Sequence, residues 1–271
     1  MDNPTSRRSF LKKSFIISSA LTTAPNLLFS DSEKHSNIPI IDYHVHLSRN
    51  FDIEQAVELA KKRNIKFGIV EHPGYNYRIR TNNHLRQYIS HLRQYPFYVG
   101  LQPVYLNWAK DFSQDLINQL DYVLMDADTI PQQDGSYMRI WQNEHFIDDM
   151  EAFMNIYMNH IIQILTNEPI SIFGRPTYLP INFARNYNEI WTKKRMMIII
   201  DLARERNIAL EIQENIRIPG IEFVKLAKKA GIKFTFGTNA RNHNAGHFNY
   251  CIDIAKQCGF TKDDIFIIKK K

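Results

Sequence analysis

Cysteine is nearly absent from this sequence of 271 residues, which contains only Cys251 and Cys258. The two stand seven positions apart in a segment with a helical pattern. At the helical rise per residue their Cα atoms lie roughly 10 Å apart, which is farther than a disulfide can bridge. We therefore expect two buried thiols on one face of a helix and no disulfide.

Excess charge is absent from the body of the chain. The net charge of +6 reflects 34 Lys and Arg against 28 Asp and Glu. Four basic residues less Asp2 give +3 in the first 30 residues, and the lysines at 269–271 give the other +3, so residues 31–268 are neutral. Binding to a phosphate backbone needs clustered Lys and Arg on the folded domain. We therefore expect a small-molecule substrate and no nucleic-acid partner.

Long apolar runs are also missing. No stretch after residue 30 has about 18 uninterrupted apolar residues, so we expect no membrane span in the mature chain. The N-terminus instead has a basic segment, Ser-Arg-Arg-Ser-Phe-Leu-Lys at 6–12, followed by a short apolar run at 15–28. This segment resembles a twin-arginine (Tat) export signal. The resemblance implies that residues 1–30 are a signal peptide, that the Tat machinery exports the folded chain, and that residues 31–271 are periplasmic or otherwise extracytoplasmic.

From residue 38 onward, short β-rich apolar runs alternate with longer segments of helical period, as in parallel sheets built from βαβ units. The expected strands are 38–43, 66–70, 97–102, 122–125, 170–173, 208–212 and 233–237. A long helix is expected over 144–166, and another helix should end before Gly231. No Gly-Ser linker interrupts the chain. We predict a single α/β domain, a distorted (β/α)7 TIM-like barrel, with an open doubly wound sheet as the alternative.

In either architecture, catalytic groups gather at the carboxyl ends of the strands. The first strand ends in the sequence Asp-Tyr-His-Val-His, with histidines at 44 and 46. Because side chains two residues apart in a strand point the same way, His44 and His46 can converge on one point. Two imidazoles at this spacing suit a divalent metal such as Zn, Mn or Fe. The alternative is that both belong to a hydrogen-bonded polar core.

Every other expected strand also ends in polar or charged side chains. These are Glu71, His72, Gln102, Asp126, Asp128, Arg175, Glu211, Asn239 and Arg241, followed by His243 and His247. Burying so many polar groups is costly unless they have partners, which makes the strand ends the candidate site. The histidines at 35, 84, 91, 145 and 160 lie outside strand ends, and we expect them at the surface or in packing roles.

The order and spacing of several blocks resemble the PHP (polymerase and histidinol phosphatase) domain over about residues 38–268. The blocks are His44-x-His46, Glu-Leu-Ala-Lys-Lys at 58–62, Glu71-His72, Ala-Leu-Glu-Ile at 209–212, Leu-Ala-Lys-Lys-Ala-Gly-Ile-Lys at 226–233, and Gly-Thr-Asn-Ala-Arg at 237–241. The resemblance implies a distorted seven-stranded βα barrel. It also implies up to three divalent metals at the barrel mouth and hydrolysis of phosphate esters by a metal-bound hydroxide.

Several members of the ligand set implied by the resemblance are replaced. His44, His46 and His72 match ligand positions, and Glu211 matches a position that is not a ligand. The replaced ligands are a bridging Glu (now Gln102), a His after the fourth strand (Asp128), the His of a His-Pro block (Arg175), and an Asp-x-His pair (Asn239 and Arg241). A neutral amide cannot bridge cations, and fixed guanidinium charges repel them. One metal ion or none is expected.

We expect the first of three functions and keep the other two as alternatives. In the first, one metal at His44, His46 and His72 activates water, and the chain is an exported hydrolase of a phosphate ester or similar small substrate. The groups expected to hold that anionic or hydroxylated substrate are Arg175, Arg241, Gln102, Asn239 and His247. In the second, no metal binds, and Glu71, Asp128 or Glu211 act as acid and base on a carbohydrate-like ligand.

In the third function the barrel binds a ligand without turnover. The two arginines also have an architectural interpretation, in which Arg175 and Arg241 pair with neighbouring carboxylates. Aromatic residues near the strand ends either stack on a sugar ring or cover the rim; they are Tyr75, Tyr77, Tyr178 and Trp191.

Overall fold

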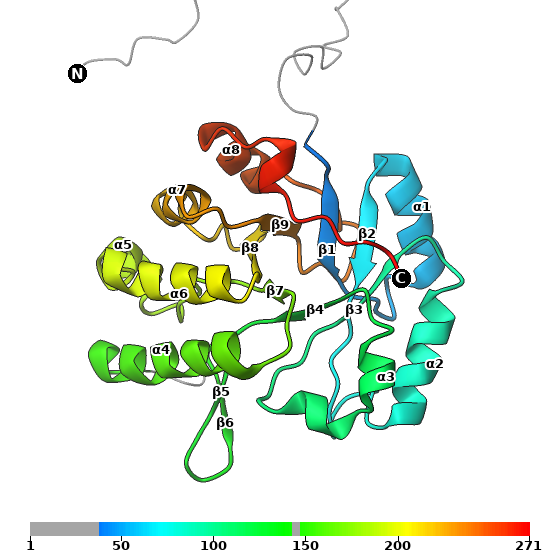
Figure 1. The fold of residues 1–271 in the computed structure, drawn as a ribbon, viewed down its shortest axis with the longest axis horizontal. Helices are drawn as coiled ribbons and strands as arrows, with labels where there is room; N and C mark the ends of the chain where they lie inside the picture. Colours follow the sequence, from blue (N-terminus) through cyan, green and yellow to red (C-terminus); the bar gives the residue numbers. More distant parts are fainter. Residues whose placement is uncertain (1–37, 143–146) are drawn as a thin grey trace, which may run out of the picture. The chain divides into compact units, whose positions relative to one another are not determined.

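Seven parallel strands close into a barrel in the order β1-β2-β3-β4-β7-β8-β9, with helices around it (Figure 1). The computed structural model describes residues 38–142 and 147–271, so the predicted signal peptide lies outside the described residues. The strands are β1 (Ile41–Val45), β2 (Lys66–Ile69), β3 (Tyr98–Leu101), β4 (Tyr122–Met125), β7 (Ile172–Phe173), β8 (Ala209–Gln213) and β9 (Phe234–Gly237). Each of them overlaps one of the seven predicted segments, and β4 alone has the predicted bounds. The closed barrel confirms the predicted (β/α)7 TIM-like fold, and the open sheet is wrong.

The helices cover the outside of the barrel (Figure 1). They are α1 (Ile53–Arg63), α2 (Asn82–Leu92), α3 (Gln114–Ile117), α4 (Met150–Asn167), α5 (Tyr187–Ile190), α6 (Lys193–Glu205), α7 (Ile221–Lys229) and α8 (Tyr250–Gln257). Short 3₁₀ turns span Trp108–Asp111, Ala184–Asn186 and Lys262–Asp264. Among the described residues, no helix is both long and apolar enough to cross a membrane.

Capping side chains set several helix boundaries. The Asp149 carboxylate accepts from the backbone N–H of Ala152, so α4 begins at Met150 and not at the predicted residue 144. As expected, α7 ends just before Gly231, whose φ of 82° lies in the left-handed region.

Both cysteines are free, as predicted. Cys251 is buried within α8, whereas Cys258 follows the helix and is only half-buried.

A two-stranded antiparallel hairpin that the sequence interpretation missed stands outside the barrel, between β4 and α4. Its strands are β5 (Thr129–Pro131) and β6 (Tyr137–Arg139), joined through Gly135 with a φ of 82°. Asp134 and Gly135 form the dipeptide that favours such turns. The hairpin follows β4 directly, so it stands at the carboxyl end of the barrel strands.

Three tyrosines fill the middle of the barrel. The Tyr122 hydroxyl donates to the backbone oxygen of Tyr43 at 2.6 Å, and Tyr43 packs on Tyr98 with ring centres 5.5 Å apart. Gly68 and Gly100 allow this packing, because a Cβ at either position would collide with the Tyr122 ring. The barrel is therefore closed by a packed aromatic layer, and a group of buried polar side chains lies above it, at the carboxyl ends of the strands.

Candidate active site at the barrel mouth

Alternation along three strands sends polar side chains into the barrel above the tyrosine layer. Steps of two from inward-facing residues of β3, β4 and β8 lead to Gln102, Asp126 and Glu211, all of which are buried. These three residues were predicted from the sequence because each lies at or near the end of a strand. In the structure they lie on one level inside the barrel.

Five polar residues at the strand ends form a closed circle of contacts, which we call the inner ring. They are His44, Gln102, Asp126, Arg175 and Glu211. His44 Nδ1 lies 2.7 Å from Glu211 Oε1, and its Nε2 lies 3.1 Å from Gln102 Oε1. Gln102 Nε2 donates to Asp126 Oδ2 at 2.8 Å, and Arg175 Nη2 donates to the same oxygen at 2.7 Å. The circle closes where the Arg175 backbone N–H donates to Glu211 Oε2 at 3.0 Å.

The acceptors around the ring fix where its hydrogens lie. An ionised Asp126 can only accept, so the Gln102 amide turns its NH₂ toward Asp126 and its oxygen toward His44. That oxygen also only accepts, so His44 Nε2 must donate. His44 Nε2 therefore carries a hydrogen and has no lone pair for a metal ion.

Arg175 holds a fixed positive charge at the edge of the ring. Its guanidinium lies 2.7 Å from Asp126 and 2.8 Å from Asp128. Burial raises the pKa of Asp126, but the opposing charge of Arg175 outweighs burial and lowers that pKa to about 2. Burial raises the pKa of Asp128 well above its usual value, against the opposing charge of the same guanidinium. Arg175 thus serves chiefly to balance buried carboxylates, in line with the architectural interpretation.

An irregularity in β1 brings His44 into the ring. Tyr43 faces the barrel interior, so strict alternation would turn His44 outward. The register with β2 shifts between Asp42 and Val45, and both Tyr43 and His44 face inward as a result. Alternation predicts that His44 and His46 share a face, and their ring centres lie 5.4 Å apart, but it does not predict that Tyr43 faces inward as well.

Gly237 at the end of β9 leaves the space that two ring members occupy. A Cβ at this position would collide with Glu211 Oε1 and lie 2.9 Å from His44 Cβ. The glycine is thus required by the close approach of the His44–Glu211 pair.

A cavity of about 440 Å³ opens above the inner ring at the carboxyl ends of the strands. Its lining residues are His72, Tyr77, Gln102, Val104, Asp126, Thr129, Arg139, Trp141, Arg175, Asn239 and Arg241. The charged side chains in this lining are three guanidiniums and one carboxylate, which is already paired with Arg175. The cavity is therefore suited to an anion.

His72 presents a free nitrogen to this cavity. Its Nδ1 lies 2.9 Å from the backbone oxygen of Gln102, which only accepts, so Nδ1 carries the hydrogen. Burial lowers the pKa of His72, which favours the neutral ring at neutral pH. Nε2 of that neutral ring is unprotonated and can act as a base.

His46 lies between the other two histidines. Its ring centre is 5.4 Å from that of His44 and 5.1 Å from that of His72. Burial, reinforced by the charges of its neighbours, lowers the pKa of His46 well below its usual value. Its buried Nε2 has no hydrogen-bond partner among the described residues. The three predicted imidazoles are therefore brought together, but only His72 lines the cavity.

The two other arginines of the lining differ from Arg175. Arg241 is exposed at the rim, where its Nη1 donates to Asn239 Oδ1 at 3.1 Å. Within the described parts of the chain, neither Arg241 nor Arg139 forms an ion pair. Both guanidiniums can therefore hold a ligand anion.

Several predicted residues lie away from the cavity lining. Glu71 accepts from the backbone N–H of His72, and neither Asp128 nor Glu211 lines the cavity. His247 is exposed and also lies outside the lining. Trp191 is fully buried beside Tyr157 and does not cover the rim.

The sequence interpretation missed Arg139 and Trp141 as lining residues. Arg139 belongs to β6 of the unpredicted hairpin, and Trp141 follows it. The signal that would have found the hairpin is the Asp134-Gly135 dipeptide after the fourth strand.

The donor set does not fit a centre of two or three metal ions. Gln102 is neutral, His44 Nε2 donates to it, and Arg175 already supplies positive charge between the carboxylates. No group of three or more His, Cys, Asp or Glu side chains is arranged to hold a metal in the part of the chain that the structure describes. The remaining free imidazole nitrogens, on His46 and His72, fit one ion at most.

Comparison with protein-family models finds no match, and comparison with curated proteins finds none. Among solved structures, the chain is similar to a chain of "cryo-EM structure of archaeal Ribonuclease P with mature tRNA". The identity is 12%, the alignment covers 81% of this chain and 87% of that chain, and the TM-score is 0.40. A similarity at this level does not define a shared function. The resemblance to the PHP family stays a prediction.

Proposed function

We propose that this chain is an exported hydrolase of small substrates that carry an anionic group, such as phosphate esters, and that it works without a metal ion. The observation that carries the proposal is the cavity of about 440 Å³ lined by three guanidiniums. Arg241, Arg139 and Asn239 hold the anionic group at the rim. Charge-assisted hydrogen bonds of this kind are about twice as strong as neutral ones and give planar, two-point recognition of oxyanions.

His72 is the general base in this proposal. Its Nδ1 hydrogen bond to Gln102 orients the ring and leaves Nε2 free toward the cavity. A water molecule gives its proton to Nε2 as its oxygen bonds to the phosphorus of the ester. The bond to the alcohol breaks, the leaving oxygen takes a proton from solvent, and the guanidiniums stabilise the charge on the remaining oxygens.

A second candidate is a hydrolase with one metal ion. The unpartnered, buried Nε2 of His46 favours it, since a buried polar atom without a partner is costly. His46 and His72 would hold the ion, which would supply a more acidic water.

Turnover of a generic aryl phosphate by the folded full chain separates the two candidates. The proposal predicts that activity survives dialysis against a chelator and is lost in His72→Gln. His84→Gln, at an exposed histidine on α2, is the matched control and should retain activity.

Activity that disappears with the chelator and returns with one equivalent of metal supports the second candidate. Ligand binding without turnover across ester panels would leave a binding barrel and contradict both.

A further inference from the structure

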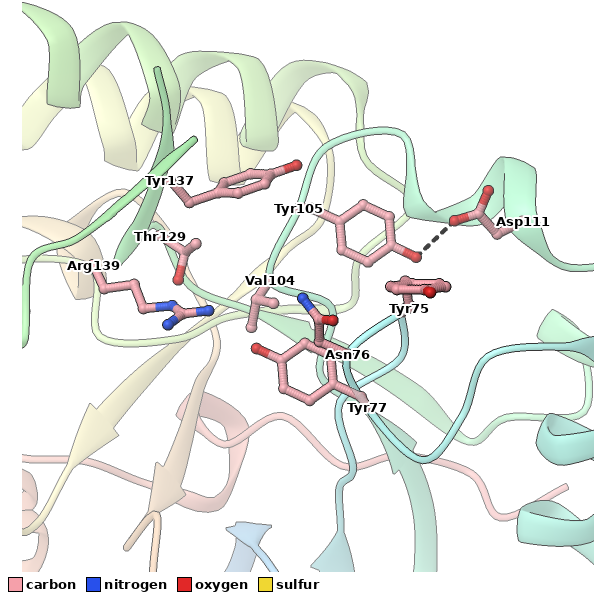
Figure 2. Close-up of a pocket in the computed structure, with 10 residues that line it drawn as sticks. Tyr75, Asn76, Tyr77, Val104, Tyr105, Asp111, Thr129, Tyr137 and Arg139 are labelled. Atoms are coloured by element: carbon pink, nitrogen blue, oxygen red, sulfur yellow. Dashed lines mark hydrogen bonds between the residues drawn. The ribbon is translucent and has the colours of Figure 1, made fainter. Parts of the chain in front are cut away.

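A second hollow of about 260 Å³ adjoins the cationic cavity, and four tyrosines are among its ten lining residues (Figure 2). The two hollows share four lining residues, Tyr77, Val104, Thr129 and Arg139. The two hollows are therefore next to each other at the barrel mouth. We call the second hollow the tyrosine pocket; its own lining residues are Gly74, Tyr75, Asn76, Tyr105, Asp111 and Tyr137.

Three separate loops at the carboxyl end of the barrel build the tyrosine pocket. Residues 74–77 follow β2, residues 104–111 follow β3, and Thr129, Tyr137 and Arg139 belong to the β5–β6 hairpin. Figure 2 shows Tyr137 and Arg139 on the hairpin side and Tyr75 and Tyr77 on the side of the β2 loop. Loops from different strands that meet in one hollow are the usual way a βα barrel builds substrate contacts.

Large aromatic faces in this pocket are open to solvent. Tyr75 is 87% exposed and Tyr137 is 45% exposed. Several exposed aromatic rings gathered at one concave place indicate a binding site more than isolated exposed residues do. The Arg80 guanidinium lies over one face of the Tyr75 ring, 6.0 Å from its centre, so the pocket offers the remaining exposed surface of Tyr75 and that of Tyr137.

Two of the rings are held in place. The Tyr105 hydroxyl donates to Asp111 Oδ2 at 2.8 Å, and the Tyr77 ring packs on His72 with centres 5.2 Å apart. A preorganised ring binds a ligand with less loss of conformational freedom than a mobile one. The contact between Tyr77 and His72 also places the tyrosine pocket next to the proposed base.

The polar groups between the rings include donors and acceptors of different kinds. They are the amide of Asn76, the carboxylate of Asp111, the hydroxyl of Thr129 and the guanidinium of Arg139. A hydroxyl group both donates and accepts, so a ligand rich in hydroxyls can pair with each of them. The apolar face of a sugar ring can meanwhile pack on a tyrosine face.

We propose that the tyrosine pocket is the subsite for a hydroxylated sugar ring whose acidic group, a phosphate or a carboxylate, is held at the cationic cavity. The substrate class is thereby narrowed from small anions to acidic sugars. This inference rests on the proposed function, because the acidic group must bind among the arginines for the ring to reach the tyrosines.

Titration calorimetry of the chelator-treated full chain tests the inference with four probes: inorganic phosphate, glucose 6-phosphate, glucuronate and adenosine monophosphate. Glucose 6-phosphate should bind at least about 10-fold more tightly than phosphate. Tyr75→Ala and Tyr137→Ala should each weaken glucose 6-phosphate by roughly 5-fold and leave phosphate unchanged, because neither residue lines the cationic cavity. Tyr75→Phe and Tyr137→Phe are matched controls that keep the ring and should bind nearly as the wild type.

Comparison of glucuronate with glucose 6-phosphate shows whether the cationic cavity prefers a carboxylate or a phosphate. Tight binding of either sugar that is weakened by Tyr75→Ala and Tyr137→Ala supports the inference. Equal affinities for phosphate and both acidic sugars would overturn the inference and leave the proposed function standing. Tyrosine-dependent binding of adenosine monophosphate alone would also overturn it, in favour of a nucleobase. Failure of all four probes to bind would contradict the proposed function itself.

Discussion

The inner ring and the part of the cavity lining outside it contain the same kinds of side chain but differ in how many of those side chains have partners. Gln102, Asp126 and Arg175 line the cavity but belong to the ring. Each region contains histidine, arginine and an amide or carboxylate at the carboxyl ends of the strands. In the inner ring, Arg175 contacts Asp126 and Asp128, and His44 contacts Glu211 and Gln102. In the cavity lining, the Arg241 guanidinium and Nε2 of His72 remain available to bind a ligand. The partners of a side chain, and not its residue type, therefore separate structural from functional groups at this barrel mouth.

The largest expected effect is on the ring. Arg175→Met should lower the free energy of unfolding by about 3–5 kcal/mol, because it leaves buried carboxylates without their cation. Arg241→Met is the matched variant outside the ring and should cost no more than about 0.5 kcal/mol. Urea denaturation at neutral pH measures both. Similar losses of unfolding free energy in the two variants would contradict the difference between a structural Arg175 and a ligand-binding Arg241.

Restoring a carboxylate at the bridging position should also destabilise the ring. Gln102→Glu removes the donor to Asp126 and places two acids side by side, at a cost of about 1–3 kcal/mol near neutral pH. The penalty should shrink as the pH falls, since one of the two carboxyls then takes up a proton. Denaturation at pH 7 and pH 5 checks this. A variant that gains stability at pH 7 would contradict the hydrogen-bond directions assigned to the ring.

Lowering the pH should destabilise the inner ring when Asp126 takes up a proton. The folded pKa of Asp126 is about 2 against an ordinary value of 3.8, so ionised Asp126 contributes stability above pH 3.8 that is lost as the pH falls through about 2. A shift of this size corresponds to about 2 kcal/mol. The stability gap between wild type and Asp126→Asn should therefore narrow by that amount between pH 5 and pH 2. A gap that stays constant would show that Arg175 does not hold the charge of this carboxylate.

The smallest expected effects concern predicted residues that the structure places outside the cavity. His247→Gln should leave both stability and turnover within experimental error, because His247 is exposed and does not line the cavity. Steady-state kinetics on an aryl phosphate measures this. A rise in KM of more than a few-fold would require the His247 side chain itself to approach the substrate.

The fold could be predicted from the sequence because each strand is a short apolar run bounded by polar residues. β4 has the predicted bounds, and β7 is shorter than predicted at its start. The hairpin was missed because its two strands are three residues long, too short for an alternating pattern to stand out. The bulged part of β1 was missed for a related reason, since alternation assumes a regular strand.

The residues of the candidate site could be predicted because they lie at or near the ends of strands. Their division into the inner ring and the free groups of the cavity lining could not. Arg175 and Arg241 both follow strands, and nothing in their neighbouring sequence distinguishes them. Arg175 becomes structural because Asp126 and Asp128 end a strand next to its own in the barrel, and that proximity exists only in the closed barrel. Arg241 meets no carboxylate at comparable distance among the described residues.

Calorimetric titration of inorganic phosphate into the chelator-treated full chain measures whether the barrel mouth binds an anion. We expect phosphate to bind, Arg241→Gln to weaken it by about 10-fold or more through loss of a charge-assisted hydrogen bond, and Arg86→Gln, at an exposed arginine on α2, to have no effect. Absence of phosphate binding, or equal binding by the wild type and Arg241→Gln, would contradict the assignment of the barrel mouth as an anion site.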